Sequence, residues 1–190
     1  MNKKGTIIAV SAPSGTGKTT IVRKILREFP EIVFSVSATT RKKRENEVYG
    51  ADYIFINEDE FMQRVKNNEF VEWEKFYDYY YGTFRSFIED TINSGKSVIL
   101  EIDVHGALEI KRIYPEAILV YIAPPSLEEL LHRLRNRRTE SEEDLKKRIE
   151  RATMELGLYH KFDYLVVNND LNTAYSEIKA IIEKITDRSN

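Results

Sequence analysis

A segment near the N-terminus has the residue types and the spacing of a loop that binds nucleotide phosphates. Two glycines let the backbone curl so that its N–H groups can surround phosphate oxygens at the start of a helix. Lys18 can reach the β- and γ-phosphates of a nucleotide, and the Thr19 hydroxyl can bind Mg²⁺. We therefore predict a site for Mg²⁺ and a nucleoside triphosphate, formed by Ala12, Pro13, Ser14, Gly15, Thr16, Gly17, Lys18 and Thr19.

The motif has one departure and one alternative interpretation. Its first position usually holds glycine and here holds Ala12, so the backbone there must tolerate a Cβ atom. The alternative is a Gly/Ser turn that happens to include a lysine. An apolar run at 6–10 precedes the loop and a helical pattern at 19–29 follows it, which is the context that a phosphate loop requires. The nucleotide site is therefore favoured, although ATPases, GTPases and small-molecule kinases all share this loop.

Composition restricts the classes of protein to which the chain can belong. Its 190 residues fit one domain, and 42% hydrophobic and 11% aromatic residues are enough for a packed core. The formal net charge of −2 argues against a surface that binds nucleic acid. The chain has no cysteine, which suits a reducing cytoplasm, and no apolar run approaches the ~18 residues of a membrane span. We expect a cytoplasmic protein that binds neither nucleic acid nor a membrane.

Short apolar runs alternate with longer amphipathic segments along most of the chain. Continuous apolar runs are typical of strands buried on both faces. The expected strands cover residues 6–10, 98–100, 118–122 and 165–167, and the expected helices cover 19–29, 127–137, 142–159 and 171–185. Ser126 and Glu129 have the spacing of a helix-capping box. This alternation predicts an α/β fold whose core has three layers, with helices on both faces of a parallel sheet.

Residues 37–83 interrupt this alternation. They are rich in Tyr, Phe, Glu and Arg, and two expected strands at 53–56 and 70–76 flank one short helix at 59–67. We interpret this stretch as a small α+β insertion at the edge of the core.

Several motifs follow one another within and beyond this insertion: 35–41 (SVSATTR), Arg44, 47–53 (EVYGADY), 69–73 (EFVEW), 80–83 (YYGT) and 101–106 (EIDVHG). With these motifs in this order, the chain resembles the guanylate kinase family from residue 6 to about residue 185. It implies a P-loop kinase of one domain that transfers the γ-phosphoryl group of Mg·ATP to GMP, and to dGMP, in purine nucleotide metabolism. The implied parts are a core (1–36, 84–131 and 149–190), a GMP-binding insertion (37–83) and a helical lid (132–148).

The resemblance also implies the residues that hold GMP. Arg41, Arg44, Tyr53 and Tyr81 would bind its phosphate, and Ser37, Glu72, Thr83 and Asp103 would surround guanine. The chemistry agrees, because arginines and tyrosine hydroxyls are suitable donors to a phosphate dianion. A carboxylate at Glu72 can accept from both guanine donors, N1–H and N2–H₂, whereas adenine would present a lone pair to it. A site of this kind rejects the wrong base by ~10⁴-fold or more.

Arginines near a predicted helix end supply the charge that phosphoryl transfer needs. The resemblance implies that Arg133, Arg137 and Arg148 contact the ATP phosphates. They would stabilise the charge of the transferring group while the lid excludes water. Asn168 matches a position near adenine, although a turn at the end of a strand explains it equally well. The catalytic set implied is Lys18, Arg41, Arg133, Arg137 and Arg148.

No general base is required, because the attacking phosphate oxygen has a second pKa of about 6. Asp103 can orient GMP, or it can act on Mg²⁺ through a water while Thr19 binds the ion directly. The chain departs from the family pattern at Ala12, Lys43, Asn46, Glu101, His105 and Arg138.

Other classes of protein need fewer of these residues. A P-loop kinase with another acceptor would keep Lys18 without needing the guanine set. A guanylate-kinase-like module that binds phosphopeptides would have little reason to keep the phosphate loop and the lid arginines. The basic run 41–44 taken alone is typical of a solvated turn, or of a patch that binds nucleic acid.

Overall fold

A five-stranded parallel sheet forms the centre of the computed structural model, which describes residues 4–13, 15–135 and 142–189. Ser14 and Arg137, for which roles were predicted, and Arg138, a departure from the family pattern, are outside the described residues. The strands are, in spatial order, β2 (Val33–Ser35), β7 (Val98–Glu101), β1 (Ile7–Ser11), β8 (Ile118–Ala123) and β9 (Tyr164–Val167). Because all five run in parallel, their carboxyl ends meet at one edge of the sheet.

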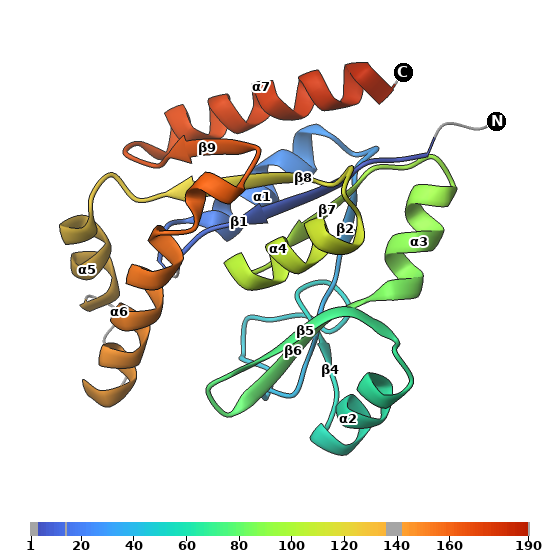
Figure 1. Cartoon of the computed structure of the whole chain (residues 1–190), viewed down its shortest axis with the longest axis horizontal. Coiled ribbons are helices and arrows are strands. Elements are labelled where there is room, and N and C mark those ends of the chain that lie inside the picture. The colour runs from blue at the N-terminus through green and yellow to red at the C-terminus, as the bar shows by residue number, and fades with distance from the viewer. Residues whose placement is uncertain (1–3, 14, 136–141, 190) are drawn as a thin grey trace.

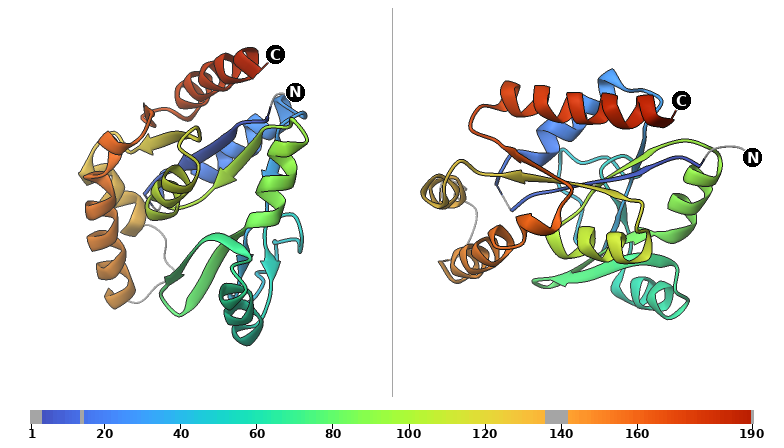
Figure 2. Two further views of the ribbon diagram at one scale, coloured as in Figure 1. Left: turned by 45° about the vertical axis from the view of Figure 1, so that its right-hand side comes forward. Right: turned by 45° about the horizontal axis from the view of Figure 1, so that its top comes forward.

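Helices cover both faces of this sheet, as the alternation predicted (Figures 1 and 2). Side chains of a strand point alternately to opposite faces. Ile8 and Val10 of β1 therefore pack with α1 (Lys18–Glu28) and α7 (Leu171–Ser189), and Ile7 packs on the other side with α3 (Arg85–Asn93) and α4 (Val104–Ile113). The expected three-layer α/β fold is confirmed.

A second, four-stranded sheet lies beside the core, and its strands fall within residues 38–84, nearly the same stretch as the insertion expected at 37–83 (Figure 1). Its strands are, in spatial order, β4 (Ile54–Phe55), β3 (Ala38–Thr39), β6 (Tyr79–Phe84) and β5 (Phe70–Phe76). Helix α2 (Glu58–Lys66) packs on it through Phe61, which is fully buried and stacks on Phe70 with ring centroids 4.6 Å apart. The β5–β6 hairpin of this sheet contacts α4 through β5.

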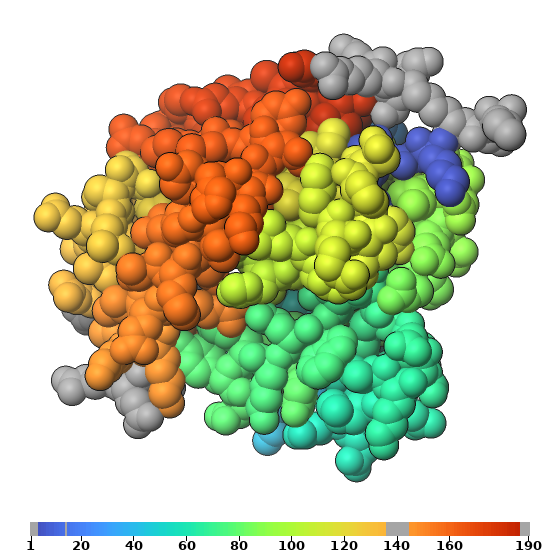
Figure 3. Space-filling model, viewed as in Figure 1, coloured from blue at the N-terminus to red at the C-terminus, as the bar shows by residue number. Residues whose placement is uncertain are grey.

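Two further helices, α5 (Leu127–Arg135) and α6 (Glu142–Leu156), pack on each other beyond the carboxyl ends of the parallel strands (Figure 1). Leu130 and Leu134 of α5 and Ala152 of α6 form their small apolar core. In the space-filling view α6 runs down beside the β5–β6 hairpin (Figure 3). The 3-10 helix η1 (Tyr159–Lys161) follows and leads into β9.

Several expected boundaries were wrong. The helix expected at 142–159 ends at Leu156, because the chain turns at Gly157 before η1, and the helix expected at 171–185 continues to Ser189. The strand expected at 53–56 is only Ile54–Phe55. The expected capping at Ser126 is confirmed, since its hydroxyl accepts from the Glu129 N–H at 3.1 Å.

The prediction also omitted elements that the structure contains. Strand β2 has three residues and β3 has two, which is too short for a periodic pattern. Helices α3 and α4 and strand β6 were not predicted either.

Candidate active site

The phosphate loop connects β1 to α1, as the motif predicted. Gly15 and Gly17 have φ values of 90° and 85°, in the left-handed region that favours glycine, so the sequence supplies glycine where the loop curls. The Thr16 hydroxyl donates to the Pro13 carbonyl at 2.9 Å and closes the turn. Ala12 is buried and fits without glycine.

The functional groups of this loop face the end of the neighbouring strand β7. Lys18 is half-buried, and its Nζ donates to the Ile102 carbonyl at 2.7 Å. The Thr19 hydroxyl contacts the Glu101 carboxylate. Val10 pairs with Glu101 in the parallel ladder, which explains why residues far apart in the chain meet here.

Asn168 holds the loop from the opposite side. It directly follows β9 and is 5% exposed, and its Nδ2 donates to the Thr16 carbonyl at 2.6 Å. Sequence reasoning offered adenine contact or a simple turn, and it missed this hydrogen bond. The proximity of Asn168 to adenine stays a prediction.

One cavity of about 380 Å³ joins the phosphate loop to the second sheet. It brings together residues predicted for both substrates: Ala12, Pro13, Gly15, Thr16, Gly17, Lys18, Thr19, Ser37, Tyr53, Glu72, Tyr81, Asp103 and Arg148. Thr83 does not line it directly but contacts Glu72. Arg41 and Arg44 line an adjacent cavity of about 320 Å³, which shares Thr19, Ser37 and Tyr53 with the first.

Glu72 is the most deeply buried carboxylate of the predicted guanine set. Its side chain comes from β5, where Glu72 pairs with Thr83 of β6, and the Thr83 hydroxyl donates to it at 2.5 Å. Burial raises the pKa of Glu72 to about 8, and Asp103 adds to that rise while the Thr83 hydrogen bond opposes it. A Cβ at Gly106 would lie 2.9 Å from Glu72 Oε2, so glycine there leaves room for the carboxylate.

Asp103 caps the start of α4. Its Oδ1 accepts from the N–H groups of His105 at 2.7 Å and Gly106 at 3.1 Å. These bonds fix the carboxylate at the carboxyl edge of the parallel sheet, on the wall of the cavity that also contains Glu72.

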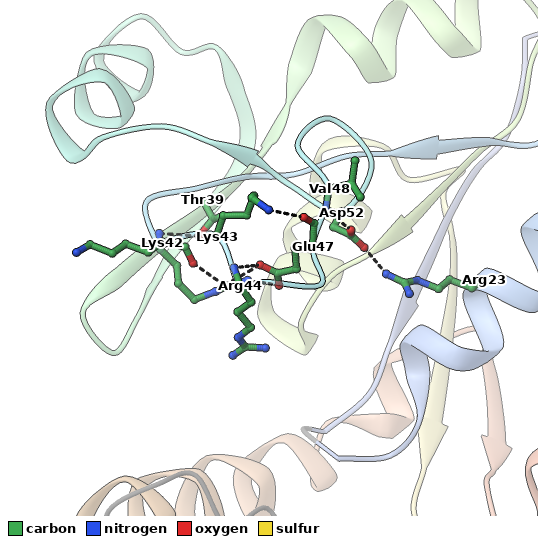
Figure 4. A network of polar contacts seen from close by, with 9 residues as sticks. Arg23, Thr39, Lys42, Lys43, Arg44, Glu47, Val48 and Asp52 are labelled. Atoms are coloured by element: carbon green, nitrogen blue, oxygen red, sulfur yellow. Dashed lines mark hydrogen bonds and ion pairs between the residues drawn. The ribbon is translucent and has the colours of Figure 1, made fainter.

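The basic loop at 41–44 is organised by a carboxylate that sequence reasoning missed. Both Glu47 oxygens accept from the Arg41 guanidinium, at 2.7 and 3.0 Å, and one accepts from the Arg44 N–H at 2.8 Å. The Lys43 Nζ donates to the Glu47 carbonyl at 2.8 Å (Figure 4). This bond links the Lys43 side chain back to the backbone of the same loop.

Asp52 ties the same loop to the core. It accepts from the Val48 N–H at 2.8 Å and pairs with Arg23 of α1 (Figure 4). Its neighbour Tyr53 lies with its ring 5.4 Å from the Arg41 guanidinium carbon and edge-on to Tyr81. Burial raises the pKa of Tyr53 to about 12, so its hydroxyl stays a hydrogen-bond donor at neutral pH.

The predicted lid arginines have different surroundings. Arg148 lines the cavity, with its guanidinium carbon 5.9 Å from the Tyr77 ring centroid. Arg133 pairs with Glu129 on its own helix at 2.7 Å and does not line the cavity. Its contact with ATP stays a prediction.

Three charged residues on the cavity wall were not predicted at all: Glu74, Arg151 and Glu155. A signal for Glu74 was available, since it lies two residues beyond Glu72 and so points to the same face of β5. For Arg151 the sequence held no such signal, because one more arginine on an amphipathic helix resembles a solvated face.

Comparison with known proteins gives one consistent result. The model of the guanylate kinase family matches residues 4–185. A guanylate kinase of Thermotoga maritima is 46% identical over 179 residues, 94% of this chain and 86% of that protein. One of Caldanaerobacter subterraneus is 43% identical over 182 residues, 96% of this chain and 88% of that protein.

A solved structure agrees with the sequence comparison. The crystal structure of guanylate kinase from Anaplasma phagocytophilum has a TM-score of 0.78 and 30% identity, and the match covers 96% of this chain and 86% of that one. Within the ranges that the structure describes, none of the helices combines the length and the apolar character needed to cross a bilayer.

Proposed function

This chain belongs to the guanylate kinase family and is an ATP:GMP phosphotransferase, and from that premise we propose how its cavity serves the two substrates. ATP lies along the phosphate loop, GMP lies along the second sheet, and the γ-phosphoryl group passes between them to give ADP and GDP. The observation that carries this proposal is that Lys18 and Glu72 line one cavity.

On the donor side, the backbone N–H groups of the loop bind the phosphates of ATP, and Lys18 adds its charge at the β- and γ-phosphates. Lys18 must leave the Ile102 carbonyl to do so, which exchanges one hydrogen bond for a stronger charged contact. Ser14 is also proposed to bind ATP, and Asn168 supports the loop through the Thr16 carbonyl.

The residues present fit Mg²⁺, which prefers oxygen ligands and keeps several waters. The Thr19 hydroxyl and the Glu101 carboxylate are in contact beside the loop, and Asp103 lies on the same cavity wall. We place the ion on Thr19, with Asp103 acting through water. When bound, Mg²⁺ neutralises charge on the phosphates.

On the acceptor side, Glu72 reads guanine. Its ionised carboxylate accepts from guanine N1–H and N2–H₂, while the hydroxyls of Ser37 and Thr83 and the carboxylate of Asp103 complete the base site. Arg41, Arg44, Tyr53 and Tyr81 bind the phosphate of GMP. Glu47 presents the Arg41 fork in a fixed orientation, which lowers the cost of ordering that side chain on binding.

The transfer step depends on alignment and on charge stabilisation. The attacking GMP oxygen is already mostly ionised at neutral pH, since its second pKa is about 6. Lys18, Arg41, Arg133, Arg137 and Arg148 are the proposed catalytic cations. Their proposed role is to neutralise the charge of the transferring group while the lid at 132–148 excludes water.

The reaction places the protein in purine nucleotide metabolism, with dGMP as a second acceptor and the cytoplasm as its compartment. The test is an ADP-release assay with Mg·ATP and GMP, dGMP, AMP, UMP or CMP. We expect turnover with GMP and dGMP, and at least ~10⁴-fold less with AMP. Equal use of AMP would contradict the base-reading role of Glu72.

A further inference from the structure

Arg151 of α6 lies where three parts of the molecule meet. Its guanidinium contacts carboxylates from the second sheet, from the parallel-sheet edge and from its own helix. The contacts are Glu74 of β5 at 2.8 and 3.0 Å, Asp103 at 3.4 Å and Glu155 at 2.7 Å. The Arg151 guanidinium carbon also lies 4.5 Å from the Phe76 ring centroid.

These contacts are largely shielded from water. The side chains of Arg151, Glu74 and Asp103 are 21%, 24% and 23% exposed, and that of Glu155 is 5% exposed. Removing one partner from a buried ion pair leaves uncompensated charge, which is much more costly than losing a surface pair. Burial raises the pKa of Glu74 to about 7, the negative charge of Asp103 adds to that rise, and the ion pair with Arg151 opposes it.

The positions of these residues connect the two substrate sites. Arg151 follows Arg148 by three residues on α6, so the two side chains lie on neighbouring parts of one helix face. Glu74 follows Glu72 by two residues on β5 and shares its face of the strand. One ion pair therefore joins the helix that carries a donor-side arginine to the strand that carries the guanine-reading carboxylate.

We propose that Arg151 is a positioning residue that holds α6 against β5 and α4, so that Arg148 and Glu72 act on one aligned pair of substrates. The inference rests on the proposed roles of Arg148 and Glu72. Arg151 need not touch either nucleotide. Its loss should therefore lower the rate of transfer more than it weakens the binding of GMP alone.

The test compares Arg151→Ala, Arg151→Lys, Glu74→Gln and the Arg151→Ala/Glu74→Gln double variant. For each, we would measure kcat and KM with Mg·ATP and GMP, and the Kd of GMP by calorimetry without ATP. We expect Arg151→Ala to lower kcat about tenfold while the Kd of GMP changes less than about threefold. The double variant should lose little more than the worse single variant, because both changes break one contact.

Arg151→Lys keeps the positive charge but has no fork to bridge several carboxylates, so we expect it to restore only part of kcat. It also guards against a misfolded Arg151→Ala protein. Arg112→Ala is the matched control, since Arg112 forms an ordinary pair with Glu109 on α4, with its side chain 70% exposed.

The outcomes separate the two proposals. If the unaltered protein releases no ADP with GMP, the proposed function fails. If it is active but Arg151→Ala and Arg151→Lys both keep the kcat of Arg112→Ala, the positioning role is wrong. Equal losses in kcat and in GMP affinity would also overturn it, because they would indicate a direct contact with GMP.

Discussion

The phosphate loop and the acceptor site each serve to hold a nucleotide, but they use different parts of the chain. The loop uses backbone groups of consecutive residues between β1 and α1, and glycines at positive φ set their direction. The acceptor site uses side chains from several separate segments, and other side chains hold them in place. Glu47 holds Arg41, Thr83 donates to Glu72, and backbone N–H groups fix Asp103. A backbone site tolerates the loss of most side chains, whereas a side-chain site depends on each supporting partner.

The largest effect is expected for Lys18, the one side chain on which catalysis by the phosphate loop is proposed to depend. Lys18→Ala should lower kcat by about 10²- to 10³-fold, because a charge aimed at the transferring phosphoryl group is lost. The thermal unfolding midpoint of the variant should hardly change, because the lost contact is one hydrogen bond from Lys18 Nζ to the Ile102 carbonyl. ADP release and a circular-dichroism melt measure both quantities. A variant with more than about a tenth of the activity would show that the backbone cradle suffices alone.

Glu72→Gln tests the most buried member of the side-chain site. The amide presents a donor where guanine also presents donors, so kcat/KM for GMP should fall by about 10²-fold, in line with an unpaired buried polar group. The GMP/AMP ratio should fall with it. Glu69→Gln is the matched control, because Glu69 pairs with Arg64 outside the cavity. An unchanged GMP/AMP ratio would remove Glu72 from base recognition.

The pH dependence of GMP use should report the same carboxylate. Since the pKa of Glu72 is raised to about 8 in the free protein, its ionised form grows as pH rises through that value. We expect kcat/KM for GMP to increase about tenfold between pH 7 and pH 9, and Glu72→Gln to lose this increase. The stability contribution has the opposite sign: the folded state binds this proton more tightly, so stability from Glu72 falls between about pH 4.5 and pH 8. A flat profile in the unaltered protein would contradict this assignment.

Glu47→Gln has the smallest expected effect and tests a residue that supports the acceptor site from behind Arg41. The amide can accept from Arg41 at one oxygen only, so the fork loses its fixed orientation and KM for GMP should rise about fivefold. Steady-state kinetics with GMP measure this, with Glu60→Gln on α2 as the control. A lower KM would have the reverse meaning, that Glu47 competes with the phosphate of GMP for Arg41.

The same contrast explains what could be predicted from the sequence. The phosphate loop is local, so eight consecutive residues and their flanking patterns were enough to place it. The parallel sheet was largely predictable from continuous apolar runs. Ser37, Glu72 and Asp103 meet only through the tertiary fold, and without the family resemblance no spacing would have united them.

Supporting residues were the hardest to predict. Glu47 follows Arg41 by six residues in an irregular loop, where no helical or strand period connects them. Arg151 and Glu74 are 77 residues apart in the chain and meet because α6 packs beside the hairpin. The role of each of these residues depends on contacts between different elements, and the residue pattern within a single element carries no information about such contacts.

Asn168 gives the phosphate loop a dependence on the order of synthesis. The carbonyl that it binds, that of Thr16, precedes it by 152 residues, and at about 5–20 residues per second a ribosome needs about 8–30 s to make that stretch. A nascent chain therefore exposes its glycine-rich turn well before the side chain that secures it exists. Nucleotide binding by the growing polypeptide should be weak until Asn168, just after β9, has emerged, so firm ATP retention requires that this residue has been made.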